Sequence, residues 1–154
     1  MAKATLLTLE ALQQAMYGIP LIRPAAIFTG ASSTPIYNVI GGRVAIRNVQ
    51  GIITVGASGA TNIHLQSNPT VGTTSNICGV LAAAGLEVNT LLTIDGTIGT
   101  AMFGVSAGAA QGQNRDSIVP AGQIEFTLSG AQTITVGWIF HYVSIDTGAY
   151  LTLA

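Results

Sequence analysis

The sequence predicts an all-β protein: a jelly-roll or sandwich-like domain preceded by an N-terminal arm that carries one short helix. Three observations support this prediction. Many short stretches alternate apolar and polar residues, turn residues separate them at spacings of roughly 8–12 positions, and helical periodicity occurs in one place. No fixed-period repeat is visible, which argues against propellers and solenoids. We therefore divide the 154 residues into an arm, residues 1–34, and a β domain, residues 35–154.

The helix is predicted over residues 8–17, where Thr8 can serve as its N-cap and Gly18 ends it. A helix of about three turns is marginal in water by itself, so its apolar side needs a covering surface. We expect that surface to belong to a neighbouring subunit or to a larger assembly. The candidate interface residues on this helix are Leu6, Leu9, Leu12, Met16 and Tyr17.

The segment after the helix contains Pro20 and Pro24, which favour extended backbone. We expect it to lead the helix away from the β domain and to contain a short strand near residues 26–29. The remaining predicted strands are 36–40, 43–49, 52–55, 61–67, 88–94, 97–105, 123–129, 133–145 and 149–153. A break is expected at Gln50-Gly51, and Asp95-Gly96 predicts a hairpin. Residues 77–84 fit either a strand or a buried helical turn.

The predicted strand over residues 133–145 is apolar on both faces, which is typical of a central strand or of one covered by a partner. Trp138 and Phe140 lie on one face, and Ile139 and Val143 lie on the other. We include Trp138 and Phe140 among the candidate interface residues.

Charge is scarce in this chain. Five Lys or Arg and six Asp or Glu residues make 7% of the chain charged, with a net charge of −1, whereas about 25% is usual. This argues against a nucleic-acid partner, because little positive charge is present to neutralise phosphates. A neutral surface suits a protein covered by other proteins, so we expect an oligomer; the alternative is an unusually neutral monomer.

Arg43 and Arg47 share one face of a predicted strand. With charge so scarce, we expect each to have an acidic partner or to border an interface. The alternative is that both are exposed charges on an edge strand, where they deter aggregation.

No pattern predicts a catalytic, cofactor-binding or metal-binding residue. Residues 104–108 read GVSAG and match the G-x-S-x-G pattern around a nucleophilic serine, but Ser106 is followed by a Gly-rich segment with no helical period. His64, His141 and Cys78 lack the local spacing of zinc ligands. No segment is long enough to span a membrane, and no signal-peptide core is present, so we expect folding in a cytoplasm.

Several segments resemble small virion structural proteins of tailed bacteriophages, of the head-decoration or cement type. They are PIYNVIGG at 35–42, NPTVG at 68–72, NIC at 76–78, VPAGQI at 119–124, WIFHY at 138–142 and GA at 148–149. The resemblance implies a β-rich homotrimer on the capsid surface that binds the major capsid protein, often with a terminal arm reaching a neighbour. It also implies assembly in the host bacterial cytoplasm.

Composition and resemblance together predict a non-enzymatic virion protein that stabilises the phage head. Two alternatives remain: a tail or head–tail component, and, more distantly, a serine hydrolase that uses Ser106. Neither a membrane nor a nucleic acid is an expected partner, and no cofactor is expected.

Overall fold

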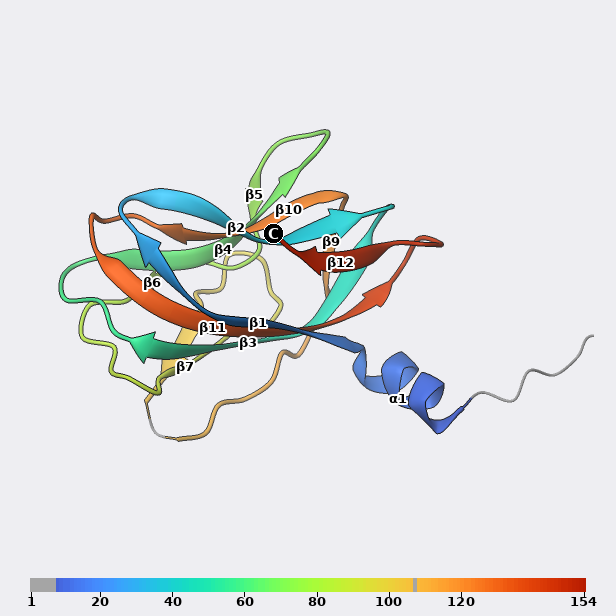
Figure 1. Ribbon diagram of the computed structural model, residues 1–154, viewed down its shortest axis with the longest axis horizontal. Coiled ribbons are helices and arrows are strands. Elements are labelled where there is room, and N and C mark those ends of the chain that lie inside the picture. The colour runs from blue at the N-terminus through green and yellow to red at the C-terminus, as the bar shows by residue number, and fades with distance from the viewer. Residues whose placement is uncertain (1–7, 107) are drawn as a thin grey trace, which may run out of the picture.

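A computed structural model describes residues 8–106 and 108–154 of the chain (Figure 1). One helix, α1 (Leu9–Tyr17), precedes the strands. In chain order the strands are β1 (Ile19–Thr29), β2 (Ser32–Ile40), β3 (Val44–Val55), β4 (Asn62–Pro69), β5 (Ser75–Asn76), β6 (Leu81–Ala82), β7 (Leu91–Thr93), β8 (Phe103–Val105), β9 (Ser117–Val119), β10 (Gly122–Leu128), β11 (Thr133–Ser144) and β12 (Tyr150–Leu153).

The strands form two antiparallel sheets that face each other. Sheet A has the order β1-β11-β3-β7-β8, and β9 also pairs with β3; sheet B has the order β12-β2-β10-β4-β5, and β6 also pairs with β4. The helix projects beyond one end of the two layers (Figure 1). The prediction of an all-β sandwich preceded by an N-terminal helix is therefore confirmed.

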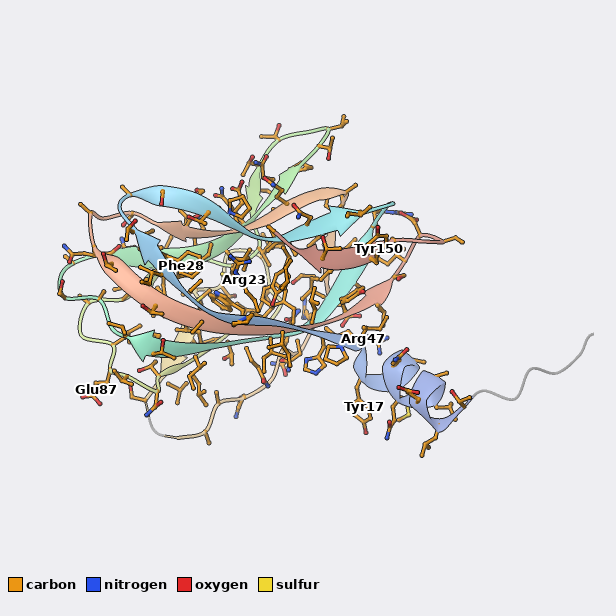
Figure 2. The ribbon with its side chains drawn as sticks, viewed as in Figure 1. Tyr17, Arg23, Phe28, Arg47, Glu87 and Tyr150 are labelled. Atoms are coloured by element: carbon orange, nitrogen blue, oxygen red, sulfur yellow. The ribbon has the colours of Figure 1, made fainter. Side chains whose placement is uncertain are left out.

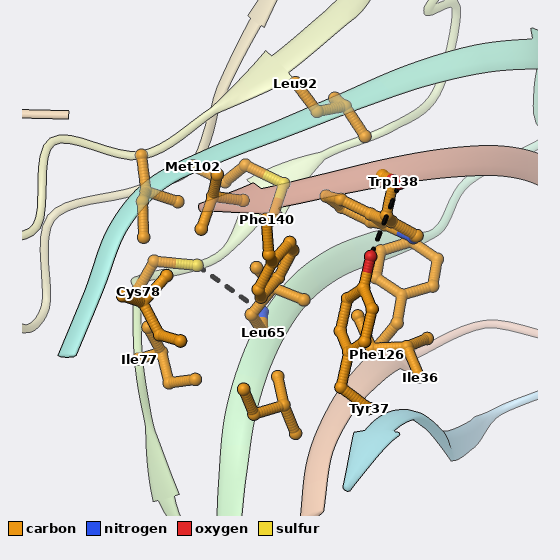
Figure 3. Close-up of a cluster of buried hydrophobic side chains, with 14 of the residues drawn as sticks. Ile36, Tyr37, Leu65, Ile77, Cys78, Leu92, Met102, Phe126, Trp138 and Phe140 are labelled. Atoms are coloured by element: carbon orange, nitrogen blue, oxygen red, sulfur yellow. Dashed lines mark hydrogen bonds between the residues drawn. The ribbon is translucent and has the colours of Figure 1, made fainter. Parts of the chain in front are cut away.

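Aromatic side chains from both sheets interlock in the core (Figure 3). Phe126 of sheet B lies between Phe28 and Trp138 of sheet A, with ring centroids 4.9 and 5.2 Å away. Phe140 of sheet A lies 4.6 Å from Tyr37 of sheet B. Such tilted and edge-on pairs are the arrangements that aromatic rings favour. This cluster joins the two layers.

The placement of Trp138 and Phe140 corrects the prediction that they belong to an interface. Their exposed fractions are 1% and 0%, because strand alternation directs both toward the opposing sheet. Ile139 and Val143, on the other face of β11, are half-buried. Since β11 lies between β1 and β3, it is the central strand that its two apolar faces indicated.

The expected break at Gln50-Gly51 is absent, because β3 runs without interruption through both residues. Gly51 is opposite Trp138 in the strand register, and a Cβ built on it would lie 2.7 Å from Cζ3 of the Trp138 ring. The glycine therefore makes room for the indole in the core and does not end the strand.

The predicted boundary between residues 34 and 35 is also wrong. Residues 19–29 form β1, which pairs with β11 and contributes the buried side chain of Phe28. Pro20 and Pro24 are tolerated because β1 is an edge strand, where an N–H pointing away from the sheet is dispensable. Pro24 itself lies in a bulge between Arg23 and Ala26. The β domain thus begins at Ile19, and the extended segment belongs to it.

The middle of the chain also differs from the prediction. Residues 77–84 are neither a long strand nor a helical turn, since the short strand β6 is their regular part. Asp95-Gly96 does not form a tight hairpin, because Thr93 pairs with Phe103 and the connection spans residues 94–102. The strand β9 was not predicted. These segments pair over two or three residues only, too few to give a clear alternation.

We expect the substitution Gly51→Ala to lower the free energy of unfolding by about 1–3 kcal/mol, the usual cost of overpacking a core. The added methyl would lie 2.7 Å from the Trp138 ring and 3.1 Å from Cβ of Leu92, and both side chains are buried. Urea-induced unfolding followed by tryptophan fluorescence measures the change.

Gly137→Ala is the matched control, because Gly137 lies on the adjacent strand one residue before Trp138. Its Cβ would be 3.4 Å from the backbone N of Ala25 and 3.6 Å from Cγ2 of Ile52, which are ordinary contacts. We expect unchanged or slightly greater stability, since glycine inside a strand is unfavourable. Equal losses from both substitutions would contradict the close fit at Gly51.

Candidate functional site

The helix α1 is defined by capping interactions at both ends. Oγ1 of Thr8 accepts a hydrogen bond from the N–H of Ala11 at 3.2 Å, as expected for an N-cap threonine. Gly18 has φ +88° and its N–H donates to the carbonyl of Gln14 at 2.9 Å. The prediction of a helix ending at Gly18 is confirmed.

The apolar side chains of α1 are exposed. Leu9, Leu12, Met16 and Tyr17 have exposed fractions of 74%, 43%, 64% and 66%, and no residue of the helix is buried. We call these four side chains the helix stripe. The fifth predicted member, Leu6, lies outside the described residues. An exposed apolar stripe on so short a helix is a candidate contact surface.

Arg47 of β3 holds the C-terminal end of the helix. Its Nη1 donates to the carbonyls of Ala15 and Met16, each at 2.7 Å, and its Nε lies 3.7 Å from Oδ2 of Asp116. A positive charge at a helix C-terminus is favourable, and α1 has no basic residue in its own last turn. Figure 2 shows Arg47 beside the root of the helix. This interaction fixes the direction in which α1 leaves the domain.

A polar hollow of about 460 Å³ lies at the root of the helix, where Met16 and Tyr17 face β3 and β11. Three of its lining residues, Asn48, Gln113 and His141, each have a buried polar atom without a hydrogen-bond partner in the described structure: Oδ1, Oε1 and Nδ1, respectively. Such atoms are normally satisfied by water or by another molecule. The hollow thus combines polar groups of the domain with Met16 and Tyr17 of the helix stripe.

A second apolar surface lies on the outer face of sheet A. We call it the trough; it is a hollow of about 320 Å³ over β1, β11 and β3. Gly137 leaves its floor free of a side chain, and Ile22 and Ile52, with exposed fractions of 62% and 39%, rise on its two sides. The residues that line the trough are Ile22, Arg23, Ala25, Gln50, Gly51, Ile52, Leu91, Gly137, Trp138 and Ile139.

Arg43 has an acidic partner, as the scarcity of charged residues in the chain led us to expect. Its Nη2 donates to Oδ1 of Asp146 at 2.8 Å and its Nε to Oδ2 at 3.0 Å, and its backbone N–H also donates to Oδ2, at 2.7 Å. Arg43 therefore joins the start of β3 to the end of β11, while Arg47 holds α1. The edge-strand alternative does not fit, because β3 lies between β11 and β7. An interface role for either arginine stays a prediction.

Ser106 does not sit in the strand–turn–helix arrangement that its motif requires. It follows β8, and the described residues after it, 108–116, form no helix. Its Oγ is 3.0 Å from Oγ1 of Thr90, which is not a general base. In the described structure the serine is thus part of a hydroxyl pair.

His64, His141 and Cys78 do not come together. His64 is on β4 of sheet B, His141 is on the outer face of β11 in sheet A, and Cys78 is buried in the core. Burial raises the pKa of the Cys78 thiol to about 11, which keeps it protonated and a poor ligand or nucleophile. Burial also lowers the pKa of His64. Within residues 8–106 and 108–154, no three His, Cys, Asp or Glu residues are grouped so that they could hold a metal ion.

Among the described residues, no helix combines the length and the apolar character needed to cross a membrane. No protein-family model matches the chain, and no curated protein matches it.

We expect Arg47→Ala to loosen α1 while the β domain stays folded. Removing a charged donor from two helix carbonyls should lower the local stability of the helix by about 1 kcal/mol. Hydrogen exchange of the amides in the last turn of α1, measured by mass spectrometry, should become faster. Arg43→Ala is the control, because Arg43 bonds to Asp146 and should leave this exchange unchanged. Equal exchange in both variants would show that Arg47 does not hold the helix.

We expect the contribution of Asp146 to stability to disappear in acid. The hydrogen bonds from Arg43 lower the pKa of Asp146 to about 2 from 3.8. The ionised form is therefore favoured in the folded state, and its contribution is present above about pH 4 and lost as the pH falls toward 2. Asp146→Asn should be less stable than the natural chain near neutral pH, and this difference in urea midpoint should shrink across that range. A difference independent of pH would contradict the pairing.

Proposed function

We propose that the protein is a non-enzymatic structural component of a tailed-bacteriophage virion, a head decoration or cement protein that binds the major capsid protein and stabilises the shell. The observation that carries this proposal is the helix stripe, which the domain holds out and leaves exposed. An exposed apolar surface of this kind suits binding to another protein, which would remove the stripe from water.

The scarcity of charge supports this proposal. Soluble monomers usually carry about 25–35% charged residues on their surface, whereas 7% of this chain is charged. Two of the few charges, Arg43 and Asp146, are used on each other. Binding to a surface of neutral polar and apolar groups has a low desolvation cost, because no strongly hydrated ion is removed from water.

The resemblance to decoration proteins supplies the specific part of the proposal. It suggests a homotrimer on the outer surface of the capsid, assembled in the host bacterial cytoplasm. Burying one leucine contributes roughly 1.5–3 kcal/mol, before the cost of association is subtracted. Contacts of this size, repeated over every copy on a shell, would raise the temperature at which the shell bursts.

Quantitative mass spectrometry of purified particles tests the proposal. A decoration protein should be present in fixed proportion to the major capsid protein, a tail component in far fewer copies, and an enzyme in none. Heads that lack the protein should burst at a lower temperature and regain stability when it is added back. Ser106→Ala should restore them equally well. Ester hydrolysis by the natural chain that is lost in Ser106→Ala would support the hydrolase alternative instead.

A further inference from the structure

We propose that α1 of one copy docks into the trough of a second copy, with the helix stripe lying between Ile22 of β1 and Ile52 of β3. This inference rests on the proposed function in one respect, the expectation that the protein assembles with itself. It names the partner of the helix stripe and the surface that receives it.

The helix of the same chain is held away from its own trough. Arg47 donates to the carbonyls of both Ala15 and Met16, so the last turn of α1 is attached near the start of β3. From there the helix projects beyond the end of the sheets (Figures 1 and 2). Folding back onto sheet A would break these hydrogen bonds. A second copy can supply its helix without breaking any of them.

The chemistry of the two surfaces matches. The helix stripe consists of Leu9, Leu12, Met16 and Tyr17, and the sides of the trough are formed mainly by isoleucine and leucine side chains. Arg23 is the charged residue in the lining. Its Nη1 donates to the carbonyls of Ile36 and Ala154, so its charge is engaged with β2 and the C-terminal end of the chain. An amphipathic helix lying in an apolar groove is a common mode of recognition.

The apolar surface continues beyond the trough. Ile27 and Val55 pair with Thr135 from either side of β11, one row along the outer face of sheet A. Their exposed fractions are 69% and 53%. A helix of nine residues is about 14 Å long, which is longer than one cross-strand row. The neighbouring row extends the contact that such a helix can make.

The contact joins two different surfaces, so it links copies head to tail and closes into a ring when the rotation permits. In a ring each copy gives one helix and receives another, which doubles the area buried per copy. This matters because one short helix covers only part of the ~800 Å² that a stable interface buries on each partner. In a closed trimer of this kind, every helix stripe would lie in the trough of a neighbouring copy.

Two variants, each with one cysteine added to the natural Cys78, test the contact directly. Leu12→Cys and Ile52→Cys are purified separately, mixed under denaturing conditions, refolded together and mildly oxidised. Neither chain can bridge its own helix and trough, so a disulfide between residues 12 and 52, identified by peptide mapping, must join two copies. We expect this disulfide to be the main product. The natural Cys78 is 1% exposed and is present in every sample.

Ile118→Cys replaces Ile52→Cys in the control mixture. Ile118 is 65% exposed and lies on β9, which pairs with β3 near Val44. Ile118 is opposite Ala45 of β3, which is seven residues, or roughly 23 Å, along that strand from Ile52. Little disulfide between residues 12 and 118 is expected. Equal yields in the two mixtures, or none with Ile52→Cys, would overturn the inference.

A second measurement uses charge in place of cysteine. Ile22→Glu puts a carboxylate on the side of the trough, at a position exposed enough to leave the fold intact. Sedimentation should show this variant as a 15.7 kDa monomer, whereas Ile118→Glu should sediment like the natural oligomer. Deletion of residues 1–17, which ends before β1, should also give a monomer with unchanged β-sheet circular dichroism. Normal assembly of Ile22→Glu would overturn the inference.

Failure of this inference and failure of the proposed function give different results. A chain that is found on phage heads but sediments as a monomer overturns the helix exchange and leaves the decoration role standing. A chain that forms the disulfide between residues 12 and 52 but is absent from particles overturns the decoration role and supports the exchange.

Discussion

The structure depends on the register of β11. One face of this strand places Trp138 and Phe140 against Phe126 and Tyr37 of the opposing sheet, with centroid distances of 5.2 and 4.6 Å for the two cross-sheet pairs. Because side chains alternate along a strand, a shift of one residue would exchange the two faces. The aromatic core therefore also determines that Ile139 faces outward and that Gly137 forms the floor of the trough.

Two polar side chains that lie inside, Tyr37 and Glu125, have specific partners. The Tyr37 hydroxyl donates to the carbonyls of Leu21 and Trp138, at 3.0 and 3.3 Å, and so ties sheet B to β1 and β11. The carboxylate of Glu125 is 6% exposed and accepts hydrogen bonds from the amides of Gln66 and Asn68. A buried carboxylate would otherwise be costly. Charge in this protein is thus used to join elements, and little of it is left to keep the surface hydrated.

The long strands and the helix could be predicted from the sequence because their signals are local. Alternation over residues 123–129 and 133–145 and the periodicity of residues 8–17 each depend on one segment at a time. The role of residues 19–29 could not be predicted in this way. Their prolines exclude a central strand but fit both a linker and an edge strand, and only the pairing with β11 decides between them.

The candidate site was predictable to a similar degree. The helix stripe follows from periodicity alone, whereas the contact of Arg47 with α1 joins residues 31 and 32 positions apart, which no spacing rule reports. Both faces of β11 are apolar, and the sequence alone does not say which face meets the core, so it predicts an interface role for Trp138 and Phe140 that the structure corrects. The trough is built from three strands, so no single segment contains its pattern.

The division between a rigid domain and an exposed helix has an energetic consequence. The β domain is held together by an interlocked aromatic core formed within the chain. The helix has no buried residue and depends on its caps and on Arg47, which leaves it close to the limit at which a short helix persists in water. Docking of the helix stripe against another surface would therefore stabilise the helix as well as the assembly. Because the helix already points in a fixed direction, its orientation needs little further ordering. In this arrangement the capping by Arg47 contributes to association as well as to local structure: a helix held in place loses less conformational entropy on docking than a free arm would.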